Sequence, residues 1–156
     1  MTWAEVCANP ILQNLPFKIE LNEWGQIVMS PASNRHGEYQ AELGIRLRTQ
    51  SATGKIISEC SVQTSHGVRV ADVAWASPEF VQTYGSVTPY EHAPELCVEI
   101  VSPSNTKREM DGKCALYFKV GAKEVWLCSE EGEVSFFTSE GQLAASKLFP
   151  RFPTRI

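Results

Sequence analysis

The stretch Pro94-Glu95-Leu96-Cys97-Val98-Glu99-Ile100-Val101-Ser102-Pro103-Ser104-Asn105 decides how the rest of the chain is organised. Its centre, Leu96 to Val101, is a short apolar run rich in β-branched residues that ends at turn-forming residues, which predicts a strand rather than a buried helix. Glu99 lies inside this run. Burying an ionised carboxylate is costly unless a cation, a metal ion or several donors compensate it. The pattern therefore predicts that such a partner faces Glu99.

The segment after this strand supplies a candidate partner. Residues 106–120 predict a helix that Ser104 or Asn105 can cap and that Gly121 can end. The strand carboxylate lies roughly 10 Å before the end of its strand. Lys113 lies roughly 12 Å into the helix. If the helix folds back on its own sheet, Lys113 can reach that carboxylate.

A second acid precedes both residues. Residues 68–76 form another strand-like run with a lone carboxylate, Asp72, inside it. Two strands that each carry one buried acid, with the lysine nearby, suit the binding of a hard divalent cation through oxygen ligands. The same arrangement suits the activation of water against a phosphodiester.

These residues carry a family resemblance. The chain has Arg-x-x-Asp-Val-Ala at 69–74, Glu-Leu-x-Val-Glu-Ile-x-Ser-Pro-Ser at 95–104, Asp-x-Lys-x-x-x-Tyr at 111–117 and Glu-Val-Trp-Leu at 124–127. This order resembles the Uma-two (Uma2) restriction endonuclease family, a branch of the PD-(D/E)XK nuclease superfamily. The resemblance runs from about Leu12 to Phe137, and its combined spacing is far more specific than any single motif.

The resemblance implies an α/β fold with a restriction-endonuclease-like mixed β-sheet flanked by helices, and a metal-dependent endonuclease that hydrolyses DNA. It implies that Asp72 and Glu99 are catalytic metal ligands, with the carbonyl of Ile100 as a further oxygen ligand and Lys113 as the motif lysine. Glu38 would be the additional acid that many members of the superfamily place on their first core helix. The implied cofactor is Mg²⁺, with Mn²⁺ as a substitute, and the implied partners are DNA and a second copy of the chain in a homodimer.

Two positions depart from the superfamily pattern. Ala71 stands where a proline usually precedes the first acid, which affects the local turn more than the chemistry. Val101 stands two residues after Glu99, where many relatives carry the lysine. An enzymatic function therefore depends on Lys113 having taken over that role from the helix.

Length and composition predict one ordinary soluble domain. The chain has 156 residues, of which 43% are hydrophobic and 21% charged, so we expect a single restriction-endonuclease-like domain over residues 1–156. No apolar stretch approaches the roughly 18 residues needed to cross a bilayer. The first residues lack the basic region and apolar core of a signal peptide. We expect a cytoplasmic protein that does not associate with membranes.

The cysteines argue against a disulfide framework and against a zinc site. There are five of them, an odd number, and no two form a Cys-x-x-Cys pair. Cys97 and Cys128 lie in apolar runs and are expected to be packing residues.

The net charge of −4 is unusual for a nuclease, because proteins that hold duplex DNA normally display a basic surface. Two interpretations remain open. Either a local basic patch suffices, or the natural substrate is not long duplex DNA. The candidates for that patch are Arg35, Arg46, Arg48, Lys107 and Arg108, and we expect Arg35, Lys107 and Arg108 to contact nucleic acid.

The remaining elements follow from local patterns. Thr2 and Glu5 predict a capping box for a short helix that ends before Asn9. The other expected elements are a hairpin over 18–21 and 26–29, a helix over 36–49, a strand over 55–64, a loop or short helix over 77–90, strands over 124–128 and 134–138, and a break at Gly141.

Several polar residues have a simpler interpretation beside the functional one. Glu38 is equally explained as a solvated acid near a helix N-terminus. His36, His66 and His92 lack a metal-ligand spacing and are expected to be ordinary surface or loop histidines. Tyr117 lies one helical turn after Lys113 and is expected to pack in the core or to orient that lysine.

Three functions remain open from the sequence. The first is the metal-dependent DNA endonuclease, which the presence of Asp72, Glu99 and Lys113 together favours. The second is a catalytically silent descendant that serves as a binding or interaction module, which the acidic net charge and Val101 favour. The third is a nuclease that acts on RNA or branched DNA.

Overall fold

The structure, a computed structural model, describes all residues from Met1 to Ile156. Its elements along the chain are α1 (Trp3–Ala8), the 3₁₀ helix η1 (Pro10–Leu12), β1 (Phe17–Leu21), β2 (Ile27–Pro31), α2 (Asn34–Gln50), β3 (Lys55–Thr64), β4 (Gly67–Ala76), α3 (Pro78–Tyr84), β5 (Leu96–Ile100), α4 (Lys107–Lys119), β6 (Glu124–Cys128), β7 (Val134–Thr138) and β8 (Gly141–Leu143). No helix combines the length and the apolar character that crossing a membrane would require.

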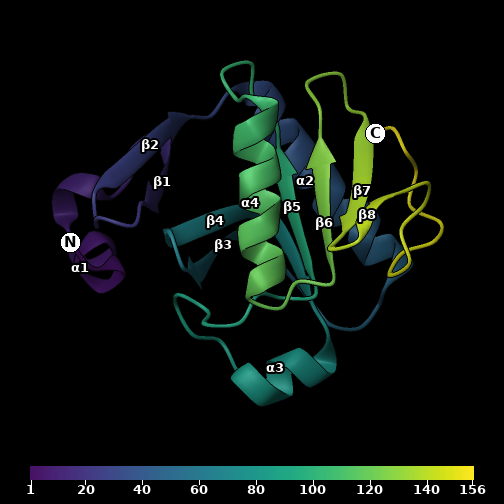
Figure 1. Cartoon of the computed structure of the whole chain (residues 1–156), viewed down its shortest axis with the longest axis horizontal. Helices are drawn as coiled ribbons and strands as arrows, with labels where there is room; N and C mark the ends of the chain where they lie inside the picture. The colour runs from purple at the N-terminus through teal and green to yellow at the C-terminus, as the bar shows by residue number, and fades with distance from the viewer.

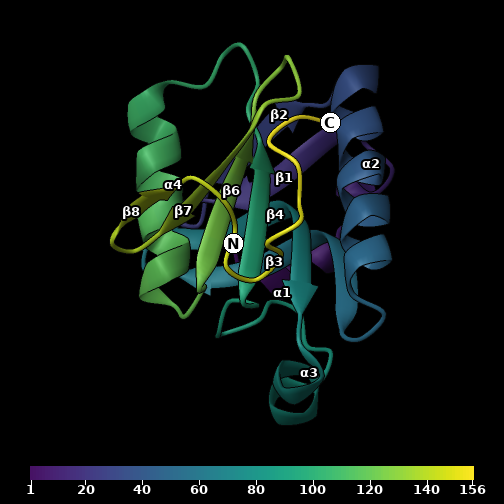
Figure 2. The same cartoon turned by 90° about the vertical axis from the view of Figure 1, so that its right-hand side faces the viewer.

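Six strands form one mixed sheet in the order β3-β4-β5-β6-β7-β8. Strands β5 and β6 are parallel, and every other neighbouring pair is antiparallel. Parallel neighbours need a long crossover connection, and α4 provides it. Helix α4 covers one face of the sheet and α2 covers the other, as Figures 1 and 2 show from two directions. The predicted α/β class, a mixed sheet flanked by helices, is confirmed.

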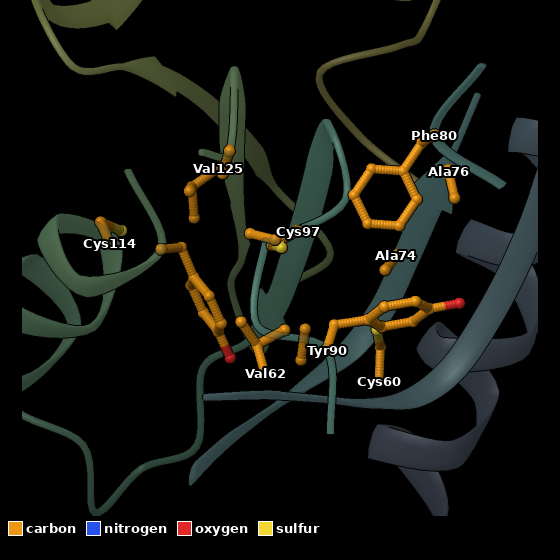
Figure 3. Packing of buried hydrophobic residues seen from close by; sticks show 13 residues of the cluster. Cys60, Val62, Ala74, Ala76, Phe80, Tyr90, Cys97, Cys114 and Val125 are labelled. Atoms are coloured by element: carbon orange, nitrogen blue, oxygen red, sulfur yellow. The ribbon is translucent and has the colours of Figure 1, made fainter. Parts of the chain in front are cut away.

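Strand β5 is buried on both faces, so its alternate residues enter two different cores. Cys97 packs on the α4 side with Cys114 and Val125, as Figure 3 shows. Val98 packs on the α2 side with Leu43. Because the strand is covered on both faces, any polar side chain that it carries is buried inside the molecule.

The N-terminal hairpin of β1 and β2 is a separate two-stranded sheet that stands beside the main sheet (Figure 1). The start of β4 holds it there, because Arg69 Nη1 donates to Leu21 O at 2.6 Å and the Val70 amide donates to Glu20 Oε1 at 2.8 Å. Gly67 has a φ of +89°, and a Cβ there would lie 2.3 Å from Leu21 O. Only glycine allows this close approach, which fixes β1 against the sheet.

The element ends refine the sequence predictions. Thr106, rather than Ser104 or Asn105, caps α4, because its hydroxyl accepts from the amide of Glu109 while the Glu109 carboxylate accepts from the amide of Thr106. The predicted cap is therefore wrong by one or two residues. Gly141, where a break was predicted, instead begins the edge strand β8.

The other local predictions agree with the structure. The predicted capping box between Thr2 and Glu5 is present. All five cysteines are free, and Cys97 and Cys128 are fully buried, as expected of packing residues.

Candidate active site

The candidate site lies where β4 separates from β5. The two strands pair from Trp75 to Val73 and no further. Just beyond, Asp72 Oδ2 accepts a hydrogen bond from the Ile100 amide at 2.7 Å. The carboxylate thus satisfies a backbone donor that the ladder leaves free. This contact directs Asp72 into the gap between the strands.

Glu99, on β5, faces the same gap and is 2% exposed. Its Oε1 accepts from the hydroxyl of Tyr117 at 2.6 Å. Its Oε2 lies 3.1 Å from Nζ of Lys113. Both partners stand on α4 and are one helical turn apart. Helix α4 therefore folds back on its own sheet as the sequence predicted, and its lysine reaches the strand carboxylate.

A second lysine joins the two acids. Lys18 Nζ lies 2.8 Å from Asp72 Oδ1 and 3.0 Å from Glu99 Oε2. Lys18 and Glu20 are two residues apart on β1, so both side chains leave the strand on the same face. Glu20 Oε1 in turn lies 2.9 Å from Nζ of Lys113. The result is a closed cluster of three buried carboxylates and two ammonium groups.

Burial opposes the charged form of Lys18, Asp72 and Glu99, and neighbouring charges decide in which direction each pKa moves. At Lys18, burial lowers the pKa, but Glu99 and Asp72 raise it by more, so the pKa lies well above its usual value. At Asp72, burial raises the pKa, but the hydrogen bond from His36 and the charge of Lys18 hold it well below its usual range. At Glu99, burial raises the pKa by more than Lys113 and Lys18 lower it. Of the two strand acids, Glu99 is therefore the one whose pKa is raised.

A further set of ligand-type side chains adjoins Asp72 from α2 and β3. His36 Nε2 lies 3.2 Å from Asp72 Oδ1. Donor atoms of His36, Glu59 and Asp72 all lie within 4.8 Å of one another, close enough to hold a metal ion. Glu59 has a φ of +52°, which is uncommon for a residue other than glycine. Gln40 Nε2 donates to Glu59 Oε1 at 2.7 Å and to the Asp72 carbonyl at 2.8 Å, which links this set to the strand.

The residues present suit a divalent cation. The cluster has one more carboxylate than ammonium groups, and its acids offer hard oxygen ligands of the type that Mg²⁺ and Mn²⁺ accept. One positive charge, the Lys18 ammonium, already lies within hydrogen-bond distance of both strand carboxylates. A position that accommodates a cation between these two acids therefore exists in the fold.

The structure brings Asp72, Glu99 and Lys113 together but separates two other candidates from them. Glu38 is exposed, and no hydrogen bond or ion pair connects it to the cluster. Lys107 is exposed and pairs with Asp111 at 2.6 Å. Among the expected nucleic-acid contacts, Arg35 lines a hollow beside His36 and Arg108 lines a second hollow beside Lys113.

The other two arginines of the predicted basic patch, Arg46 and Arg48, make their contacts within α2 and just after its end. Arg46 pairs with Glu42 at 2.6 Å, and Arg48 Nη1 donates to the carbonyls of Ser51 and Ala52 after the helix end. Both lie away from the acids, at the far end of a helix whose N-terminal turn carries His36.

Sequence reasoning missed Lys18, Glu20 and Glu59, and it was wrong to treat His36 as an ordinary surface or loop residue. Two signals were available for the hairpin residues. Lys18 and Glu20 lie two residues apart on a predicted strand, so they share one face, and their charges are opposite. No local signal marks His36 or Glu59, because both reach Asp72 only after α2 and β3 have packed.

Comparisons with known proteins identify the family and the fold. The family model Uma2, described as "Putative restriction endonuclease", matches residues 3–154. The chain also resembles the crystal structure of "a putative nuclease belonging to DUF820 from Anabaena variabilis ATCC 29413", with a TM-score of 0.69 and 17% identity over 99% of this chain and 83% of that one. At this identity the likeness concerns the fold. No curated protein matches the chain. Because the family model spans nearly every residue, this protein belongs to the Uma2 family.

Proposed function

We propose that this protein is a metal-dependent endonuclease that hydrolyses DNA phosphodiester bonds at the Asp72, Glu99 and Lys113 site. The observation that supports it best is the shared cation position, in which one positive charge lies within 3.0 Å of carboxylate oxygens from two different strands. Two buried carboxylates that contact the same ammonium group would repel each other if no cation lay between them. Membership in the Uma2 family points to the same class of chemistry.

In this proposal Asp72 and Glu99, with the Ile100 carbonyl, hold Mg²⁺ or Mn²⁺. When bound, the metal ion would neutralise charge on the phosphate and make a water molecule more acidic. The Ile100 amide keeps Asp72 oriented, and the Tyr117 hydroxyl keeps Glu99 oriented. Lys113 directs its ammonium group at the same point, where it can stabilise developing negative charge on the phosphate or orient water.

A catalytically silent interaction module is the second candidate, and Lys18 is the observation that favours it. Its ammonium bridges the two strand acids without any metal ion. Val101 leaves the usual lysine position of the motif vacant, and the net charge of −4 opposes DNA binding. In such a protein the only role of the acid cluster would be to stabilise the fold.

Cleavage of supercoiled plasmid with Mg²⁺ or Mn²⁺ tests the enzyme. The variants are Asp72→Ala and Glu99→Gln, and the control is Asp111→Asn, which removes an exposed acid from the helix that carries Lys113. We expect both site variants to lose activity by about 100-fold or more, while the control retains it. Circular dichroism verifies that each variant is folded.

Equal background cleavage in all four proteins would overturn the endonuclease. Calorimetric titration with Mg²⁺ or Mn²⁺ then decides the second candidate, because a silent module whose two strand acids are bridged by Lys18 binds neither ion. An ion that binds the parent protein but not Asp72→Ala would instead support the metal site.

A further inference from the structure

Two hollows adjoin the acid cluster and meet beside it. The His36 hollow, about 490 Å³ in volume, is lined by His36 and Ile100, two of the residues that contact Asp72. The Lys113 hollow, about 670 Å³ in volume, is lined by Glu20 and Lys113. Ser30 and Ser104 line both hollows. The two hollows therefore lie side by side, and together we call them the groove.

The His36 hollow has the character of a pocket for a nucleobase. Met29, Pro31 and Val101 give it apolar walls, and Ser102 adds a hydroxyl group. Its volume lies within the range of about 300 to 1,000 Å³ that is typical of small-ligand pockets. Arg35 is its one strong cation, and a single nitrogen of that guanidinium is hydrogen-bonded, to Glu130 O at 3.5 Å. Apolar side chains beside several hydroxyl groups and one guanidinium suit a planar base, whose edges carry polar atoms, with one adjoining phosphate.

The Lys113 hollow has a different character. Three cationic side chains and one imidazole line it, Arg69, Arg108, Lys113 and His66, and they outnumber its two carboxylates, Glu20 and Glu109. Arginine and lysine are the groups that bind phosphate most strongly in proteins. Phosphates of a nucleic-acid backbone suit this hollow better than a base does.

The charge of the whole protein limits which nucleic acid can use this groove. Affinity for duplex DNA depends on many contacts from lysine and arginine to phosphates, whereas this chain has a net charge of −4. Recognition of unpaired strands depends more on contacts to the faces and edges of bases. A base in a closed stack cannot enter a pocket unless it leaves the duplex.

We propose that the substrate reaches the site as an unpaired DNA strand, with one nucleotide in the His36 hollow and the adjoining phosphates in the Lys113 hollow. The phosphodiester between them then lies beside Asp72, Glu99 and Lys113. This inference rests on the proposed nuclease function and adds the form of its substrate. It also gives the acidic composition a physical explanation, because a pocket for one base replaces a broad basic surface.

Fluorescence anisotropy tests the preference. A labelled single strand, the same sequence as a perfect duplex, and that duplex with one bulged nucleotide are titrated with the parent protein in EDTA, where no metal-dependent cleavage occurs, and again in Ca²⁺. We expect the single strand and the bulged duplex to bind about tenfold or more tightly than the perfect duplex. Equal or tighter binding of the perfect duplex, or no binding of any DNA in both buffers, would overturn the proposal.

A pair of arginine variants locates the strand. Arg35→Ala removes the cation of the His36 hollow, and Arg46→Ala removes one from the same helix about 16 Å further along, outside both hollows. We expect Arg35→Ala to weaken single-strand binding about fivefold or more and Arg46→Ala to leave it unchanged. Equal effects would place the strand elsewhere.

Photo-crosslinking of a single strand that carries 5-iodouracil gives an independent location. We expect the crosslinks at Met29 or Tyr39, which line the His36 hollow, and crosslinks confined to other faces would overturn the assignment. Measurements of binding and of cleavage also distinguish a failure of this inference from a failure of the proposed function. A protein that binds unpaired strands without cleaving them would contradict the proposed function alone, whereas one that cleaves but prefers perfect duplex would contradict this inference alone.

Discussion

Glu99 and Glu124 are two buried carboxylates on neighbouring parallel strands, and their surroundings differ completely. Their exposed fractions are 2% and 1%, and β5 and β6 pair side by side. Glu99 faces two ammonium groups and a tyrosine hydroxyl that come from β1 and α4. Glu124 contacts no cation.

Glu124 is satisfied entirely by neutral donors. Its Oε2 accepts from Trp126 Nε1 at 2.8 Å and from Ser146 Oγ at 2.7 Å. Its Oε1 accepts from the backbone amides of Lys147 and Leu148 at 2.7 and 2.9 Å. Two donors on each oxygen leave no room for a ligand. The carboxylate therefore anchors the segment after β8 to the sheet.

The comparison teaches that burial by itself does not mark a functional acid. Backbone amides and a neighbouring indole are held in place by the chain, so the hydrogen bonds of Glu124 are permanent parts of the fold. The ammonium groups at Glu99 end flexible side chains, and a metal ion or a substrate can displace them. The kind of partner distinguishes a structural carboxylate from a candidate catalytic one.

The largest expected effect follows from replacing each acid by its amide. Glu124→Gln turns an NH₂ group toward two donors that had an acceptor, so we expect it to lower the free energy of unfolding by about 2 to 4 kcal/mol. Glu99→Gln leaves Lys18 with Asp72 and Lys113 with Glu20, so neither ammonium group loses its last carboxylate, and we expect a smaller loss, below about 2 kcal/mol. Urea unfolding followed by circular dichroism measures both.

The same two variants, Glu124→Gln and Glu99→Gln, should also differ in nuclease activity. The folded fraction of Glu124→Gln should cleave plasmid like the parent protein, whereas Glu99→Gln should not. If Glu99→Gln proved the more destabilising variant and Glu124→Gln lost its activity while folded, the division between structural and catalytic acids would be reversed.

A smaller effect concerns the exchangeable cation. Lys18→Met removes the ammonium that occupies the position between Asp72 and Glu99, so a divalent ion no longer has to displace it. We expect Mg²⁺ or Mn²⁺ to bind about tenfold more tightly, equivalent to about 1.4 kcal/mol. Calorimetry measures the affinity, and a larger rise in melting temperature on adding metal is an independent readout.

Lys107→Met is the matched control, because it removes an exposed lysine that pairs with Asp111 outside the site. Unchanged metal affinity in Lys18→Met, or an equal gain in both variants, would show that Lys18 does not compete with a metal ion.

The smallest expected effect is a pH dependence of stability at His36. The hydrogen bond to Asp72 raises the pKa of His36, and burial opposes it by less. A group whose pKa is higher in the folded state contributes stability fully below its unfolded pKa, about 6.5, and the contribution is lost as the pH rises through the folded pKa. We therefore expect His36→Asn to cost more stability at about pH 5.5 than at about pH 9.

Urea unfolding in EDTA at the two pH values measures this difference. The pKa of Asp72 lies well below its usual range, so the carboxylate that faces His36 stays ionised at both. A cost that is equal at both pH values, or larger at the higher one, would show that His36 does not bind its proton more tightly in the folded protein. His66→Asn, which changes an exposed turn residue, is the control.

Much of the fold was predictable because its signals are local. The apolar run of β5, the pattern of residues 68–76, the capping box at Thr2 and the helix that ends before Gly121 depend on residues close in sequence. The approach of Lys113 to Glu99 was also predictable, because one tight connection joins their two elements and the rise per residue of each is known.

The rest of the site was not predictable for a physical reason. Lys18 reaches Asp72 across 54 residues and Glu99 across 81. No local pattern reports such distances, since the hairpin is positioned by contacts with residues far away in the sequence, such as Arg69 and Val70 on β4. The superfamily pattern did not indicate the hairpin either. It pointed to Glu38 on α2 as the additional acid, whereas the structure places Glu20 of β1 at the cluster.

By itself, the sequence determined that two acids lie inside apolar strands and that a lysine follows one of them at a distance its helix can bridge. Short-range periodicity and covalent geometry suffice for that. The tertiary structure alone decided which cations surround the acids, that Lys18 lies between them, and that Glu124 is sealed by neutral donors while Glu99 is not. Those outcomes depend on which surfaces meet when β1, α2 and α4 pack on the sheet, and packing is a property of the whole chain.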